Sequence, residues 1–172
     1  FEPVDQEEPF RSILATDVEV GPDGAIWASD WVHGWDGEGK GRLWRFVPED
    51  LPAEAVALAG EVRRLLSGDW SAISPDRLGG LLGHPDRRVR LEAQWELVRR
   101  GETARLATIA RDTEAPLPAR VHAVQGLGQA ARREGAATIP VTLLADRSWE
   151  SRLLAARAAP PPPPIRTSAT RW

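Results

Sequence analysis

The stretch "GPDGAIWASDWVHGWDGEGKGRLWRF", residues 21–46, gathers four of the chain's eight tryptophans among glycines and aspartates. The "PDG" at 22–24 supplies the proline and glycine of a tight turn between two alternating segments, "ATDVEV" before it and "AIWASDW" after it. A glycine-rich segment then leads to "RLWRF" at 42–46, which alternates less regularly. We therefore predict antiparallel strands between residues 16 and 46.

A sheet of only three strands buries little apolar surface by itself. Its aromatic side chains remain exposed to solvent unless further strands or helices cover them. Tryptophans spaced along short strands with Asp-Gly turns are typical of one blade of a β-propeller, which packs between neighbouring blades. The chain also contains no methionine and begins at Phe1. We therefore expect a fragment of a larger protein that is poorly stable alone and associates through its open strands and exposed tryptophans, such as Trp27, Trp31 and Trp44.

Composition narrows the classes of protein further. The 172 residues, 42% hydrophobic and 27% charged, suffice for one domain or two small ones. Without cysteine the chain forms no disulfide, no thiolate metal site and no covalent haem attachment. Residues 1–50 carry a net charge of −8 and the rest +5, which predicts two parts of different character but no nucleic-acid binding. No targeting signal is recognised, and no apolar run approaches the ~18 residues of a transmembrane segment.

After Pro48 the apolar period changes from about 2 to about 3.6 residues, which predicts helices from about residue 52 to residue 159. The segment "PAEAVALAGEVRRLLSG" at 52–68 predicts a connecting helix. Ser74 and Pro75 then predict the start of another. The face expected to be apolar in the connecting helix consists of Ala55, Leu58, Val62, Leu65 and Leu66.

A four-residue pattern then recurs, as "RLEA" at 90–93, "RVHA" at 120–123 and "RLLA" at 152–155. Each copy follows a shorter apolar helix, so the repeated unit is a helix–turn–helix at the period of a solenoid. The predicted fold class is α+β by segregation, a propeller-blade piece followed by an α-solenoid of HEAT-like helix pairs. The predicted core of the repeats is Leu91, Ala93, Leu97, Val121, Ala123, Leu127, Leu153 and Ala155.

The residues from "ATDVEV" through "RLWRF", with "LLGHPDRRVRLEAQWELVRRGE" and "ARVHAVQGLGQAAR", resemble the large membrane-bound dehydrogenases of planctomycetes and verrucomicrobia. These are also called PVC-type haem-binding proteins, and they join a quinoprotein-like propeller to HEAT repeats and a cytochrome c module. The resemblance covers about residues 10–159 and implies a periplasmic or secreted redox protein. It implies haem c in the parent protein, with a quinone or calcium as further cofactors. It assigns no catalytic, cofactor-binding or metal-binding residue in this chain.

Three polar residues between the strands, Asp30, His33 and Asp36, form the weak candidate site within the chain. His33 would act there as a base or a ligand. The competing interpretation is loop architecture, because aspartates commonly close turns against backbone N–H groups. The repeated Arg90, Arg120 and Arg152 could bind an anionic partner, although a stacking role in the repeats explains them without a ligand.

These observations predict four segments and leave two functions open. The segments are propeller strands at 1–47, a connecting helix and linker at 48–73, about three HEAT-like repeats at 74–159 with the last incomplete, and a proline-rich disordered tail at 160–172. The first function is the junction of a propeller–HEAT redox protein, in which this chain alone is not catalytic and contacts the rest of the propeller and solenoid. The second is a protein-interaction scaffold without catalysis.

Overall fold

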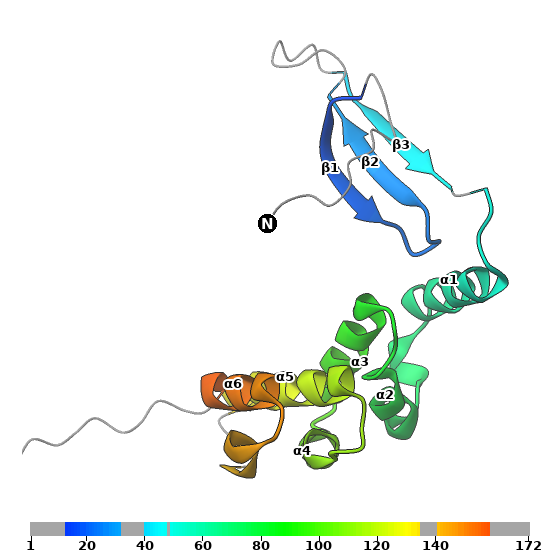
Figure 1. The fold of residues 1–172 in the computed structure, drawn as a ribbon. Helices are drawn as coiled ribbons and strands as arrows, with labels where there is room; N and C mark the ends of the chain where they lie inside the picture. Colours follow the sequence, from blue (N-terminus) through cyan, green and yellow to red (C-terminus); the bar gives the residue numbers. More distant parts are fainter. Residues whose placement is uncertain (1–12, 32–39, 48, 135–140, 159–172) are drawn as a thin grey trace, which may run out of the picture. The chain divides into compact units, whose positions relative to one another are not determined.

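The computed structural model describes residues 13–31, 40–47, 49–134 and 141–158 (Figure 1). It divides into two compact units, residues 1–67 and 68–172. The described residues form a three-stranded antiparallel sheet followed by six α-helices, so the predicted α+β class is confirmed. None of these described helices combines the length and the apolar character needed to cross a bilayer.

The sheet has the simple strand order β1-β2-β3, with both neighbouring pairs antiparallel. Its strands are β1 (Ala15–Val20), β2 (Ile26–Asp30) and β3 (Arg42–Phe46). The turn between β1 and β2 needs Gly24, whose φ of 77° lies in the left-handed region that side chains disfavour. The predicted hairpin and third strand are thus confirmed.

The apolar side chains of the sheet are covered unevenly. Ala28 in the central strand is buried, whereas Val18 and Val20 in β1 are 57% and 49% exposed. The tryptophans are less exposed than expected, because arginine side chains lie over two of them. The guanidinium carbon of Arg45 is 5.7 Å from the ring centroid of Trp27, and that of Arg42 is 5.1 Å from that of Trp44.

The connecting helix α1 (Ala53–Leu66) begins directly after Pro52, as the sequence predicts. Of its five predicted apolar positions, Val62 and Leu65 are buried and the other three are half-buried. The acidic Glu54 lies in its first turn and two arginines lie in its last. This charge order complements the dipole of the helix.

The second unit contains helices of alternating length joined by short loops. α2 packs on α3, α4 on α5, and a short 3₁₀ helix, η3, on α6. In addition α5 packs on both α3 and α6, while α4 contacts both α2 and η3. The elements are η2 (Trp70–Ala72), α2 (Pro75–Leu81), α3 (Arg87–Arg99), α4 (Thr103–Arg111), α5 (Leu117–Glu134), η3 (Val141–Ala145) and α6 (Trp149–Ala158).

The third sequence repeat differs from the first two at its first helix. The segment expected to be α-helical there, with Leu143 and Leu144 apolar, forms the five-residue 3₁₀ helix η3. Leu143 is buried, but Leu144 is 44% exposed. The segment lies between Pro140 and Asp146 in the sequence and is too short to repay the cost of nucleating an α-helix.

The buried stripe of the second helices is displaced from the predicted one. Ala93, Leu97, Ala123, Leu127 and Ala155 are buried as predicted. Three predicted core residues are not, since Leu91 and Val121 are half-buried and Leu153 is 46% exposed. A residue two positions before an alanine of the stripe points about 200° away from it on a helix. The residue four positions before lies on the same face, and there Val89, Ala119 and Ser151 are buried.

The loops before the three second helices share a side-chain turn. His84 Nδ1 accepts a hydrogen bond from the backbone N–H of Asp86 at 2.9 Å. Asp112 Oδ1 accepts from the N–H two residues later at 3.0 Å, and Asp146 Oδ1 does so at 2.8 Å. Each acceptor thereby closes its loop locally.

Candidate functional site

Of the three polar residues predicted as a candidate site, the structure describes only Asp30. The carboxylate of Asp30 accepts hydrogen bonds from Leu14 N at 3.0 Å and Trp44 Nε1 at 2.9 Å, and Arg42 Nη2 lies 2.6 Å from it. The hydrogen bond from Trp44 is the main cause of a pKa held below the usual range of an aspartate. Asp30 therefore ties the residue before β1 to β3. His33 and Asp36 lie outside the described residues.

A second polar cluster lies between α3 and α5. His122 Nδ1 is 2.8 Å from Gln94 Oε1, and Gln94 Nε2 donates to Gln129 Oε1 at 3.3 Å. Burial, followed by the positive charges of Arg90 and Arg87, lowers the pKa of His122 to about 4. The imidazole is therefore neutral near pH 7 and donates its Nδ1 hydrogen to the amide oxygen of Gln94. This cluster joins two packed helices.

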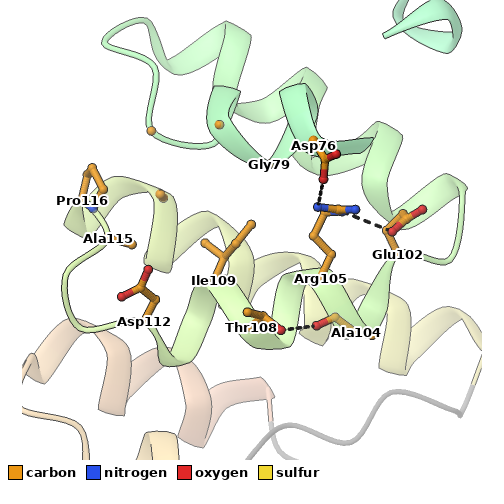
Figure 2. Close-up of a pocket in the computed structure, with 13 residues that line it drawn as sticks. Asp76, Gly79, Glu102, Ala104, Arg105, Thr108, Ile109, Asp112, Ala115 and Pro116 are labelled. Carbon is orange, nitrogen blue, oxygen red and sulfur yellow. Dashed lines mark hydrogen bonds and ion pairs between the residues drawn. The ribbon is translucent and has the colours of Figure 1, made fainter. Parts of the chain in front are cut away.

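A groove of about 800 Å³ lies between α2 and α4 in the helical unit. We call it the α2–α4 groove (Figure 2). One wall is the glycine-rich face of α2, and the other carries Arg105, Thr108 and Ile109 of α4. The loop from Asp112 to Pro116 closes one end. Its size is that of sites that bind small molecules or the side chains of an extended peptide.

Glycines at 79, 80 and 83 open the α2 wall of the groove, and they differ in how much room surrounds them. A Cβ atom on Gly79 would lie 3.3 Å from Ile109 Cδ1, so packing between α2 and α4 limits that position. A Cβ atom on Gly80 would meet nothing within 4 Å. Glycine within a helix costs about 1 kcal/mol relative to alanine. Packing therefore explains Gly79, while at Gly80 the missing side chain leaves open space.

The charged side chains of the groove are predominantly acidic. Arg105 Nη1 lies 2.6 Å from Asp76 Oδ1, and Arg105 Nε lies 3.4 Å from Glu102 Oε2 (Figure 2). The hydrogen bond to Asp76 is the main cause of a pKa of Arg105 above its ordinary value. Asp112 adds a third carboxylate, so the lining holds three acids and one guanidinium. The groove thus offers apolar walls and a net negative charge.

The sequence reasoning missed this groove, although one signal was present. "RLGGLLG" at 77–83 places Gly79 and Gly80 inside the short helix α2 and Gly83 just beyond its end, and the two internal glycines cost helix stability without an evident local reason. The sequence pattern at Ser74 and Pro75 predicts only the start of a helix there. The pairing of α2 with α4, on which the groove depends, follows from tertiary packing.

No known protein family, no curated protein and no solved structure matched the chain. Among the residues that the structure describes, no three acidic or histidine side chains are grouped so that they could hold a metal ion. The candidate site therefore rests on geometry alone, and the α2–α4 groove is the part of that geometry best formed to receive a ligand.

Proposed function

We propose that the helical unit is a short solenoid of HEAT-like repeats that serves as a protein-interaction scaffold, with the α2–α4 groove as its binding surface. The repeat interpretation is supported by the shared loop turn, the shared buried stripe and the recurring arginines. It is also supported by the packing of first helices on first helices and of second helices on second helices. Solenoids of this kind use such extended surfaces to hold partners.

The observation that carries the binding proposal is the open space at Gly80. A helix that had no ligand to admit would gain stability from alanine there, because nothing would collide with the added methyl group. The acidic lining then selects the partner by charge. The matching partner is an extended segment with one apolar side chain and a lysine or arginine beside it. The apolar side chain packs against Gly80 and Ile109, and the basic side chain pairs with the acidic residues of the lining.

The larger protein would be a propeller–HEAT protein, as the resemblance implies. The exposed valines of β1 support this part of the proposal, because a propeller blade covers such residues with its neighbour. Redox chemistry, with haem c and a quinone or calcium, would then belong to other parts of that protein. The complete gene tests this directly, since it should encode further propeller strands before this segment and a CxxCH motif elsewhere.

The groove is tested with three fluorescein-labelled decapeptides of glycine and serine, each with one central leucine flanked by four lysines, four glutamines or four glutamates. Fluorescence anisotropy with the full chain should show the lysine peptide binding best and weakening as salt is raised. Gly80→Phe fills the open space and should abolish binding, whereas Gly80→Ala should reduce it only slightly.

Circular dichroism must show the same helix content for both Gly80 variants. Glu102→Gln should lower the affinity for the lysine peptide and leave that for the glutamine peptide unchanged. Equal binding of the lysine and glutamate peptides, or full binding by Gly80→Phe, would reject the α2–α4 groove as the binding surface.

A further inference from the structure

A second groove lies on the other row of helices, between α3, α5 and α6. Its volume is about 470 Å³, and all of its nine lining residues belong to these three helices. Its aromatic wall is Trp95 of α3, which is 47% exposed. Ala158, the last residue of α6, lines the opposite edge. We call this hollow the Trp95 groove.

The polar side chains that line the Trp95 groove include several hydrogen-bond donors and no carboxylate. Gln125, Gln129 and Arg132 of α5 lie along it, and Arg157 of α6 adds a second guanidinium. Glutamine amides and guanidinium groups donate to carbonyl oxygens. A ligand suited to this groove therefore presents apolar rings to the indole and unpaired carbonyl oxygens to the donors.

A run of five prolines at 160–164 has this chemistry. Such a run is predicted to adopt the polyproline II conformation, in which no backbone carbonyl is bonded internally. Its rings pack on exposed aromatic side chains, and its carbonyls accept hydrogen bonds from side chains around them, as in other proline-recognition grooves. The residues at 159–172 carry two arginines and no acidic side chain, so ring packing and carbonyl acceptors, and not charge attraction, would hold the run in the groove.

Chain connectivity allows this run to reach the groove. Pro160 follows Ala158, a lining residue, by only two positions. The seven residues from 158 to 164 would span about 20 Å in polyproline II, at about 3.1 Å per residue. Since α5 packs on both α6 and α3, a path from α6 to Trp95 crosses two helix spacings of about 8–10 Å each. The run is therefore long enough to lie across the groove and reach Trp95.

We propose that the Trp95 groove is a polyproline-docking site occupied by this chain's own prolines at 160–164. Docking in this way covers Trp95. The proposal is independent of the α2–α4 groove, which lies on the first helices of the repeats.

The experiment uses the full chain labelled with 5-fluorotryptophan and observed by ¹⁹F NMR. Trp95→Phe assigns the resonance of Trp95, and Trp149→Phe assigns that of Trp149, which is 61% exposed on α6 but does not line the groove. Replacing all five prolines by serine should shift the Trp95 resonance and leave the Trp149 resonance in place. Adding an unlabelled synthetic peptide of residues 159–172 to the serine variant should move the Trp95 resonance back.

Matched arginine variants test the donors. Arg132→Met removes a lining donor and should reduce the shift caused by the serine replacement, whereas Arg133→Met, on the same helix but outside the groove, should not. A Trp95 resonance that is the same with prolines and with serines would overturn the proposal. So would a shift that disappears on dilution, since that would assign the docked prolines to a second molecule.

Discussion

Arg90 and Arg152 make the same pair of contacts in the first and third repeats. Arg90 Nη1 donates to the carbonyl oxygens of His84 and Pro85, six and five residues earlier, both at 2.7 Å. Arg152 Nη1 donates to the carbonyl oxygens six and five residues earlier at 2.7 and 3.0 Å. The repeated arginine thus braces the loop that precedes its own helix, which explains its recurrence without an anionic ligand.

Arg120 in the second repeat departs from this pattern. Arg120 Nε instead donates to the carbonyl oxygen of Ala110, ten residues earlier, at 3.4 Å. Its Nη2 pairs with Asp146 in the loop of the next repeat, and both side chains are buried. The second arginine therefore links two repeats, while the outer ones each brace a single loop.

Arg90→Met should lower the free energy of unfolding by about 1–3 kcal/mol, because two loop carbonyls lose a charged donor while the aliphatic stem is retained. Urea unfolding followed by circular dichroism measures the change. Arg87→Met, an exposed position on the same helix, is the matched control and should change stability by less than about 0.5 kcal/mol. Equal effects of the two substitutions would mean that the brace contributes no stability.

The neutral His122 makes stability depend on pH. Its pKa is about 4 in the folded state and about 6.5 when unfolded, so between these values the unfolded state binds the extra proton. The free energy of unfolding should therefore fall by about 2 kcal/mol as the pH drops from 6.5 to 4. It should change little from this cause above pH 6.5.

His122→Gln removes this titration and should flatten the profile between pH 4 and 6.5. Urea titrations at several pH values measure the profile, and the value at pH 8 separates the packing cost of the substitution from the lost titration. Arg90→Met should raise the lower pH limit of this sloping region, since the Arg90 charge helps to lower the pKa of His122 in the folded state. If the profile of His122→Gln runs parallel to that of the unsubstituted protein, the pH dependence belongs to other groups.

Local signals in the sequence predict where helices, strands and turns lie better than they predict which side of a helix is buried. The turn at Pro22–Gly24 and the start of α2 at Ser74 and Pro75 are set by residues within a few positions, and both are confirmed. The predicted buried stripe is wrong by two positions, since "RLEA" marks Leu91 by its apolarity although Val89 shares the face of Ala93. The α2–α4 groove depends on which helices pack together, and no local pattern encodes that choice.

Ser151 occupies the buried position that Val89 and Ala119 occupy in the other repeats. Its side chain is fully buried, and its hydroxyl has no hydrogen-bond partner in the described structure. Ser151→Ala should therefore raise the free energy of unfolding by about 1 kcal/mol, because it removes an unsatisfied buried hydroxyl. Thermal melts of the two proteins measure the difference.

Ser148→Ala is the contrasting variant for Ser151→Ala. Ser148 Oγ accepts a hydrogen bond from Ser151 N at 3.3 Å, so its loss removes a helix cap and should destabilise by about 1 kcal/mol. Destabilisation by Ser151→Ala would show that the hydroxyl finds a partner in solution.

Two glycines on different helices should respond oppositely to alanine. A Cβ atom on Gly128 of α5 would lie 2.8 Å from the Cβ atom of Ala158, closer than real Cβ atoms approach. Gly128→Ala should therefore force α5 and α6 apart and destabilise by about 1–3 kcal/mol, despite the better helix propensity of alanine. At Gly80 nothing lies within 4 Å, so Gly80→Ala should stabilise by about 0.5–1 kcal/mol. Chemical denaturation of both variants measures the contrast, and stabilisation by Gly128→Ala would show that α5 and α6 do not pack at this distance.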